Sequence, residues 1–306
     1  MSTAEIGRQL DDLGGAIDDL LGPEPPVLLG LGEPTHGVAA FPMLRNELLP
    51  ALVERGYRSI ALEVDHFAAS VVDDYVAGGT ADVNEVLETG FSHRFGAVPG
   101  NRELVEWLRA HNAEREPQDR VRFRGFDGPM EISGAPSPRR ALTSVIDYLS
   151  VDLDVDGLLG ADADWSSEAA MFDPAASIGG SDRARALRVI ADDLASALRR
   201  AAPGLCRRDP DAHDRATAHA RTALGLLRYH AAMASSSTDR IATLLSLRAE
   251  MMADNLLAIV AREQHRGPTL VFAHNAHLQR APSDMAVRRG RGELGRRGGA
   301  RLPGLG

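Results

Sequence analysis

The stretch VLLGLGEPTHG, residues 27–37, decides the fold, because an apolar run stops there at a carboxylate and then at an imidazole. Residues 27–31 are typical of a buried strand, which a glycine and a proline bring to an end. Glu33 and His36 are then expected on the loop after the strand, where ligands bind in open α/β sheets. Taken alone, the same residues also fit a polar turn that caps a helix.

The composition of the chain indicates a protein with a full hydrophobic core and disfavours several kinds of partner. The 306 residues can bury a full core, and their formal net charge of −9 disfavours nucleic acid and anionic membranes as partners. The single cysteine, Cys206, cannot form an internal disulfide, which fits a reducing compartment. The N-terminal residues do not have the pattern of a signal peptide. No apolar run reaches the roughly 18 residues that a membrane-spanning helix needs. We therefore expect a cytoplasmic protein, and the sequence leaves its oligomeric state open.

The absence of lysine excludes several kinds of active site. All 34 residues counted as lysine plus arginine are arginine, so a Walker P-loop, a Schiff base and a lysine nucleophile are ruled out. No GxGxxG follows a predicted strand, and HExxH and paired CxxC do not occur, which removes the commonest zinc signatures. The nearest approach to a serine hydrolase elbow, GFSHR at residues 90–94, lacks the second glycine.

Strand and helix patterns alternate along the chain, which predicts an α/β fold with a parallel or mixed central sheet flanked by helices. Strands are expected at residues 27–32, 58–63, 121–127 and 268–274. Helices are expected at residues 4–21, 39–54, 66–77, 81–88 and 101–114. A large helical region over about 137–264, interrupted by a Gly-, Asp- and Ser-rich stretch at 157–182, is placed beside the active-site cleft.

One domain is predicted over residues 1–280. From residue 281 the chain is rich in arginine and glycine and has little apolar periodicity, so residues 281–306 are predicted to form a disordered tail. A basic tail also suits RNA binding, which the acidic remainder of the chain disfavours.

Each predicted strand runs into an ionisable residue. The four residues are Glu33, Glu63, Asp127 and His274. Because the carboxyl ends of parallel strands share one edge of a sheet, these side chains are expected to converge. Such a convergence favours an active site over a polar rim.

The last strand leads into a second motif, FAHNAHLQR, residues 272–280. On a helix or tight turn, the spacing of His274 and His277 places both rings on one side, and Asn275 can hold one of them through its amide. With one of the strand-end glutamates, the two imidazoles could bind a divalent metal. Alternatively, the same residues hold a water, a carbonyl or a leaving group without metal. The residues alone leave both interpretations open.

Six short segments occur in an order that points to one family. They are LGEPTHGVAAFPMLR (31–45), SIALEVD (59–65), NRELVEWLRAHN (101–112), VRFRGFDGP (121–129), RAEMMADNLL (248–257) and VFAHNAHLQR (271–280). In these segments, which span most of residues 25–280, the chain resembles the erythromycin esterase family. The resemblance implies an α/β sheet with a helical flank over a deep cleft. It also implies a hydrolase of esters or lactones, macrolide lactones in the characterised members, that requires no metal.

The resemblance implies a role for the residues around the first motif. His36 matches the family's general base, which activates water, and Glu33 matches the acidic residue before it. Arg45 matches an arginine of the cleft, where a guanidinium can stabilise an oxyanion. A histidine held by a carboxylate is a suitable base near neutral pH.

The remaining site residues follow from the later segments. Glu63 matches the acidic residue that closes the second strand, and His274 and His277 match the family's histidine pair. These groups are expected to position water and to protonate the departing alkoxide. Further contacts with a small ester or lactone substrate are expected from His93, Asn101, Asp127 and Asn275.

Two alternatives accompany the hydrolase prediction: a metal- or haem-binding module and an inactive, shortened paralogue. More distant relatives of the superfamily bind metal or haem, so a divalent metal could lie at Glu33, Glu63, His274 and His277. The chain also departs from the family pattern, with Ala40 in place of an acidic residue and Ala249 in place of an aspartate. Family members usually continue beyond the histidine motif. An inactive, shortened paralogue is therefore the last alternative.

The other histidines fall on helical, charged stretches. They are expected at the solvated surface: His66, His111, His213, His219, His230 and His265.

Overall fold

The computed structural model describes residues 13–131, 134–279, 283–289 and 293–300. The chain divides into two compact units, one of residues 1–126 and 256–278 and the other of residues 127–255 and 279–306. The predicted helix at residues 4–21 lies partly outside the described residues. The boundary between one domain at 1–280 and a tail at 281–306 stays a prediction.

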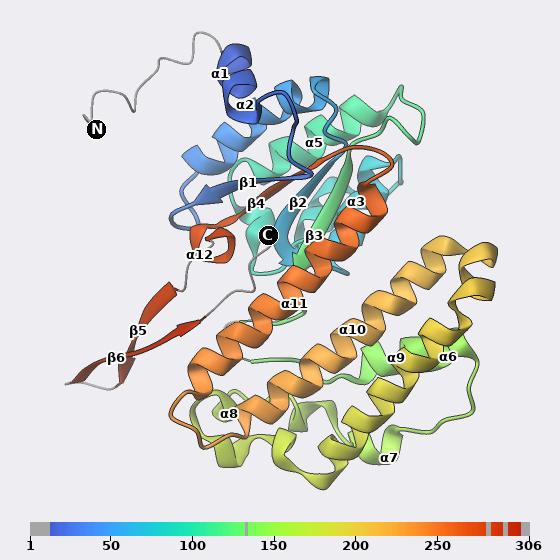
Figure 1. Cartoon of the computed structure of the whole chain (residues 1–306), viewed down its shortest axis with the longest axis vertical. Coiled ribbons are helices and arrows are strands. Elements are labelled where there is room, and N and C mark those ends of the chain that lie inside the picture. Colours follow the sequence, from blue (N-terminus) through green and yellow to red (C-terminus); the bar gives the residue numbers. More distant parts are fainter. Residues whose placement is uncertain (1–12, 132–133, 280–282, 290–292, 301–306) are drawn as a thin grey trace. The chain divides into compact units, whose positions relative to one another are not determined.

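A four-stranded sheet in the order β1-β4-β2-β3 forms the centre of the first unit (Figure 1). Its strands are β1 (Leu28–Glu33), β2 (Ser59–Asp65), β3 (Arg122–Asp127) and β4 (Thr269–His274). Strand β4 pairs in parallel with β1 on one side and with β2 on the other. The sheet confirms the predicted α/β class, and its strands lie close to the predicted ranges.

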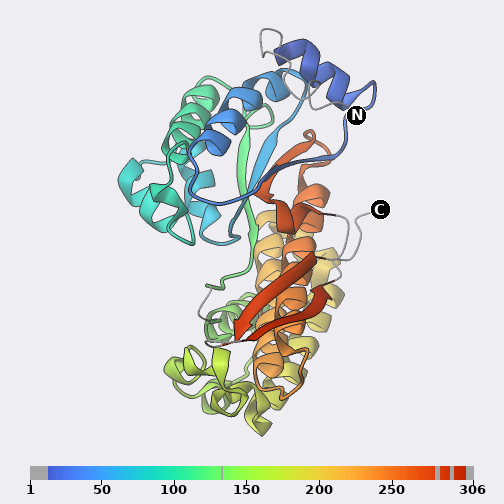
Figure 2. The ribbon, with the colours of Figure 1, turned by 90° about the vertical axis from the view of Figure 1, so that its left-hand side faces the viewer.

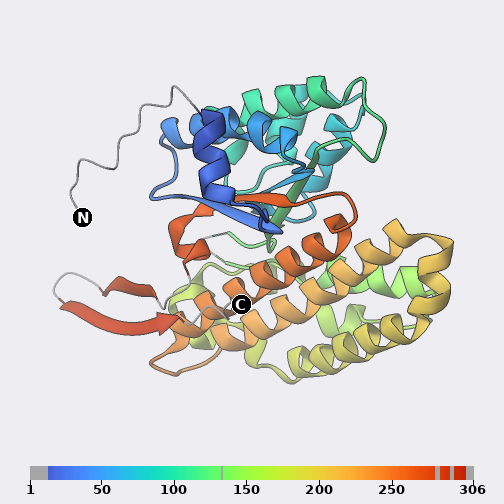
Figure 3. The ribbon, with the colours of Figure 1, turned by 45° about the horizontal axis from the view of Figure 1, so that its top comes forward.

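Helices pack around this sheet in the first unit. They are α1 (Leu13–Leu21), α2 (Ala40–Glu54), α3 (Ala69–Val76), α4 (Val83–Thr89), the 3₁₀ helix η3 (Phe95–Ala97), α5 (Asn101–Asn112) and α12 (Asn275–Leu278). Helices α1, α2 and α5 lie on the same face of the sheet (Figures 1 and 3). Helix α2 packs Leu49 and Leu52 into a core that Ile60 of β2 and Leu270 of β4 share. Burial of each such side chain stabilises the fold by about 1.5–3 kcal/mol.

Helices make up most of the second unit. They are α6 (Arg139–Leu149), α7 (Asp156–Leu159), η4 (Asp162–Asp164), α8 (Ala169–Phe172), η5 (Pro174–Ala176), η6 (Ile178–Gly180), α9 (Asp182–Arg208), α10 (Pro210–Met233) and most of α11 (Arg240–Glu263). Long helices and short turns thus fill the predicted helical region. Helices α10 and α11 run side by side (Figures 1 and 3), and Gly225 permits this approach, because a Cβ there would lie 2.6 Å from Met251 Sδ.

Two more strands lie where the composition predicts a tail. Strands β5 (Ser283–Arg289) and β6 (Glu293–Ala300) pair in antiparallel fashion (Figure 2). The Arg- and Gly-rich composition, which has little period-2 alternation, did not indicate this regular element. Among the described residues, no helix combines the length and the apolar composition that a membrane crossing requires.

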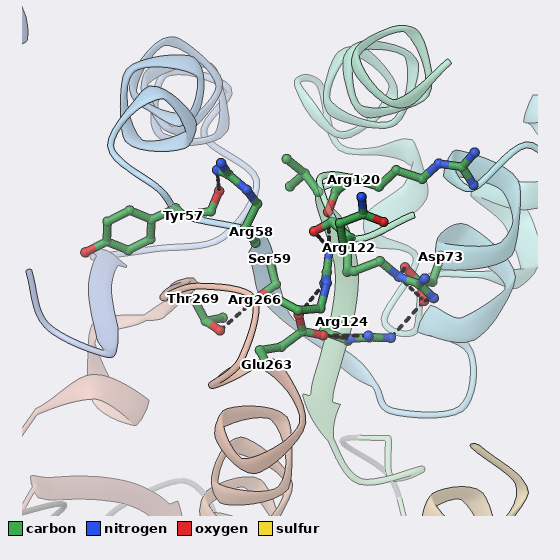
Figure 4. Close-up of polar contacts among 12 residues, drawn as sticks. Tyr57, Arg58, Ser59, Asp73, Arg120, Arg122, Arg124, Glu263, Arg266 and Thr269 are labelled. Carbon is green, nitrogen blue, oxygen red and sulfur yellow. Dashed lines mark hydrogen bonds and ion pairs between the residues drawn. The ribbon is translucent and has the colours of Figure 1, made fainter. Parts of the chain in front are cut away.

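Buried ion pairs link β3 to the end of α11 in the first unit (Figure 4). Arg124 of β3 donates to Glu263 Oε1 at 2.6 and 3.0 Å and to Asp73 Oδ2 at 2.7 Å. Arg122 donates to the same Asp73 carboxylate, and Arg266 donates to Glu263. The Glu263 side chain is 1% exposed, so its charge depends on these arginines for compensation.

We predict that Glu263→Gln lowers the free energy of unfolding by about 3–5 kcal/mol, because it leaves buried guanidinium groups without their counter-ion. Urea denaturation of the purified chain measures the change. Glu106→Gln is the matched control, since Glu106 forms an exposed pair with Arg102 at 3.4 Å and its loss should cost less than about 1 kcal/mol. Equal effects of the two substitutions would contradict the prediction.

Two of the histidines expected at the surface are instead buried, so the expectation is wrong for His213 and His230, which are 9% and 1% exposed. The Nε2 atom of His230 lies 2.9 Å from the Pro136 carbonyl oxygen, and its ring contacts Trp165 edge-on. Burial lowers the pKa of His230 below its ordinary value of 6.5. The prediction was based on the charged residues of the surrounding helix. The His230 ring, however, lies on the apolar face of α10.

The buried His230 predicts a loss of stability in mild acid. The folded chain keeps this imidazole neutral, whereas the unfolded chain takes up a proton below about pH 6.5, so stability is full above that pH and falls below it. We expect His230→Phe to flatten the change in unfolding free energy between about pH 7.5 and 5. The same substitution at the exposed His265 is the control. If the unfolding free energy changed equally with pH in the wild type, His230→Phe and His265→Phe, His230 would not be the source of the acid sensitivity.

Candidate active site

The place of β4 in the sheet brings the ends of three strands together. Glu33, the last residue of β1, lies opposite His274, the last residue of β4. On the other side of β4, Glu63 Oε2 accepts the backbone N–H of His274 at 3.0 Å. The predicted convergence is therefore present for these three residues. Strand β2 runs on to Asp65, so Glu63 lies two residues before its end.

His36 is held by Glu33. Its Nδ1 atom lies 2.6 Å from Glu33 Oε1, and because an ionised carboxylate can only accept, the ring donates from Nδ1. Nε2 is then the basic nitrogen. Glu33 is 6% exposed, and its Oε2 atom is buried without a hydrogen-bond partner among the described residues. The His36 side chain is 38% exposed, so the ring reaches both the pocket and solvent.

Glu63 lies between two imidazoles. Its Oε1 atom is 3.1 Å from His277 Nε2 and 3.9 Å from His36 Nε2. Carboxylates and imidazoles thus alternate in the order Glu33, His36, Glu63 and His277, which we call the acid–imidazole row. An arrangement of this kind can pass a proton between neighbouring groups.

Both ring nitrogens of His274 are already engaged. Its Nδ1 atom accepts the backbone N–H of Ala276 at 3.1 Å, so the proton of the neutral ring is on Nε2. Nε2 lies 3.0 Å from the carbonyl oxygen of Pro34, to which it donates. His274 therefore links the start of α12 to the loop that carries His36.

Arg45 lies on α2 and is fully buried, with 0% of its surface exposed. Its guanidinium donates to Asn46 Oδ1 at 2.9 and 3.1 Å, to Asn101 Oδ1 at 2.9 Å and to the Gly100 carbonyl at 3.0 Å. It also lies 4.8 Å from the ring centroid of Phe272. Burial among neutral acceptors lowers the pKa of Arg45 to about 9, although Glu33 and Glu103 act in the opposite direction.

A small pocket lies over this cluster. Its polar lining consists of Glu33, His36, Arg45, Glu63 and Asn101, and its apolar lining includes Phe95, Val98 and Phe272. The cavity volume of about 20 Å³ is enough for one water molecule.

The four predicted substrate contacts lie in different places. Asn101 lines the pocket, but its amide is used by Arg45 and by the Phe95 carbonyl, to which it donates at 2.8 Å. Asn275 is exposed at the start of α12, next to Gly32, where a Cβ would lie 2.0 Å from its Oδ1 atom. Neither Asn275 nor His93 lines the pocket; the His93 ring lies 5.4 Å from that of Phe95.

Asp127 ends β3 as predicted and is fully buried. Its carboxylate accepts from Arg248 at 2.5 and 3.1 Å and from the Gly128 backbone N–H at 2.8 Å. Asp127 and Arg248 belong to the second unit by their contacts. The ion pair neutralises the charge of Asp127, and its substrate contact stays a prediction.

Two residues of the site were not found by sequence reasoning: Phe95, which lines the pocket, and Asn46, which binds Arg45 and the Gly100 carbonyl. Asn46 follows Arg45 directly, so the polar run of residues 45–47 inside an otherwise apolar helix was the available signal. Phe95 lies in a Gly- and Pro-punctuated segment without periodicity, where no sequence pattern indicates which ring turns inward. Among the described residues, no three His, Cys, Asp or Glu side chains are arranged to hold a metal ion.

The profile of the erythromycin esterase family matches residues 52–303. The chain belongs to this family. Membership in the erythromycin esterase family supports a hydrolase-type function. No curated protein matches the chain significantly.

Three solved structures share the fold. A protein from Bacillus cereus is 18% identical, with a TM-score of 0.66 over 97% of this chain and 76% of that one. A His-to-Asn mutant of the erythromycin esterase EreC in its open conformation is 22% identical, with a TM-score of 0.62 over 88% of this chain and 65% of EreC. A succinoglycan biosynthesis protein is 19% identical, with a TM-score of 0.57 over 90% of this chain and 63% of that one. The chain thus spans less than two thirds of the last two.

We predict that Arg45→Lys destabilises the chain by about 1–3 kcal/mol, because an ammonium group cannot reach Asn46, Asn101 and Gly100 together and a buried acceptor left unsatisfied, such as Asn101 Oδ1, carries a cost of that size. Thermal and urea unfolding measure the loss. Arg102→Lys at an exposed position of α5 is the matched control and should change little. A stable Arg45→Lys protein would show that the hydrogen bonds of Arg45 matter less than its charge.

Proposed function

We propose that this member of the erythromycin esterase family hydrolyses a carboxylic ester or lactone, with His36 as the general base. The observation that carries the proposal is the 2.6 Å bond between His36 and Glu33 beside a pocket with room for one water. The bond orients the ring and leaves Nε2 free to take a proton from water. A macrolide lactone is one candidate substrate.

The water would be held from two sides. It donates one hydrogen bond to His36 Nε2 and the other to Glu63 Oε1, two atoms that lie 3.9 Å apart. Glu33 lines this pocket, and its Oε2 atom has no hydrogen-bond partner among the described residues. A buried acceptor without a donor carries a free-energy cost, which a bound water or substrate hydroxyl that reached it would remove.

The chemical steps follow from these contacts. The water oxygen bonds to the carbonyl carbon while its proton moves to His36 Nε2, and the carbonyl becomes a tetrahedral oxyanion. Arg45, which lines the pocket, stabilises this negative charge through its field. The carbon–oxygen bond then breaks, and the alkoxide takes the proton from His36 or from the Glu63–His277 pair. No metal or cofactor enters these steps.

Replacing His36 tests the proposal. We expect His36→Asn to lower kcat/KM for ester and lactone substrates by about 100- to 10,000-fold, because it removes the base, while the melting temperature stays near that of the wild type. The purified chain is screened against short-chain esters and lactones, macrolides included. His265→Asn, at an exposed position on the loop after α11, is the matched control.

A wild-type level of hydrolysis by His36→Asn would rule out the role of His36 as the general base.

Elemental analysis of protein purified without chelator or metal-affinity tag addresses the alternative of a metal-binding module. Stoichiometric metal that disappears in His274→Ala would favour that alternative. A folded wild-type chain that hydrolyses none of the substrates and holds no metal would favour an inactive paralogue.

A further inference from the structure

Residues 92–100, between α4 and α5, form a tightly anchored segment that we call the Phe95 turn. At its start, Ser92 Oγ accepts the backbone N–H of Asp65, at the end of β2, at 2.8 Å. At its centre, Gly96 approaches α4 so closely that a Cβ there would lie 1.8 Å from the carbonyl oxygen of Leu87. Both contacts tie the turn to elements that are themselves packed in the first unit.

The end of the Phe95 turn is anchored by α2. The carbonyl of Gly100 accepts from Arg45 at 3.0 Å and from Asn46 Nδ2 at 2.7 Å. Asn101 accepts from Arg45 and donates back to the Phe95 carbonyl at 2.8 Å. The buried Arg45 therefore holds the turn through its neighbours on both α2 and α5.

The backbone of the turn is strained just before Phe95. His93 and Arg94 have φ angles of 57° and 59°, in the left-handed region that residues with a side chain rarely adopt. Two successive residues in this region persist only when the surrounding contacts hold them there, and such residues gather at functional sites. The anchors at Ser92, Gly96 and Gly100 supply those contacts.

The strained turn places the Phe95 ring against His36. The two ring centroids are 5.0 Å apart with an interplanar angle of 48°, and Phe95 lines the pocket beside the acid–imidazole row. The loop of His36 is exposed, and its ring has a single short hydrogen bond, to Glu33. The His274 ring lies 5.2 Å from the His36 ring, so Phe95 and His274 are the two aromatic neighbours that can hold it. A ring contact on one side limits rotation of the imidazole away from that bond.

We propose that Phe95 is a positioning residue for His36. The Phe95 turn, held by Arg45, Asn46 and Asn101, keeps the imidazole in the orientation in which Nδ1 donates to Glu33 and Nε2 points toward Glu63. Phe95 takes no part in proton transfer. The catalytic consequence of this positioning rests on the proposed function, whereas the orientation of His36 can be measured without any substrate.

Two variants that remove the aromatic ring, Phe95→Leu and Phe95→Met, test the proposal, and Phe95→Tyr, which keeps the ring, is the conservative rescue. Phe172→Leu is the matched control, because Phe172 is 87% exposed on α8. One measurement is the tautomer of the His36 ring, read from ¹H–¹⁵N correlation spectra across a pH titration. The other is kcat and KM for an ester that the wild type hydrolyses.

We expect the ring-free variants to lose the Nδ1–H preference of His36 and to lower kcat by about 10- to 100-fold with KM unchanged, while Phe95→Tyr and Phe172→Leu behave as the wild type. A higher KM with unchanged kcat and tautomer would overturn the proposal, because Phe95 would then contact only substrate. Unchanged spectra and kinetics would also overturn it. If no ester is hydrolysed but the tautomer shifts as expected, the proposed function fails and the positioning role stands.

Discussion

The site depends on one constraint of the sheet, the insertion of β4 between β1 and β2. This insertion lets the strand that ends in His274 contribute to both neighbours at once. Glu33 lies opposite His274 in the register, and the carboxylate of Glu63 accepts the His274 backbone N–H. With β4 at an edge of the sheet, the residues that follow it would have at most one of the two glutamates beside them. The acid–imidazole row therefore depends on the order of the strands as well as on the residues at their ends.

Much of the first unit can be predicted from the sequence, because its elements are short and strongly patterned. An apolar run that ends at Gly and Pro located the first strand, alternation located the third, and helical periodicity located α2 and α5 within a few residues. The pairing of Glu33 with His36 was also accessible, since two residues on one short loop can meet whatever the rest of the chain does. The family resemblance supplied roles for these residues but no distances.

Other parts of the site depend on long-range packing that leaves no local pattern. The order of the strands depends on which arrangement buries the most apolar surface. The sequence of residues 268–274 does not indicate that β4 lies between β1 and β2. The engagement of His274 Nε2 depends on the Pro34 carbonyl, far away in sequence. Burial of His230 was missed for the same reason, because a charged helix can still turn one polar ring into its core.

The strained backbone at His93 and Arg94 has a consequence for the response of the protein to heat. Each left-handed residue carries about 1–3 kcal/mol of unfavourable energy that packing elsewhere offsets. When warming weakens that packing, relaxation of the turn lowers its free energy by releasing the strain, whereas the strands of the sheet hold no such strain to release. We therefore expect local opening to start in this turn, once its anchors weaken, at temperatures where the core is still intact. With the proposed hydrolase function, turnover would then be lost reversibly before the chain melts, and the temperature range of activity would be narrower than that of folded stability.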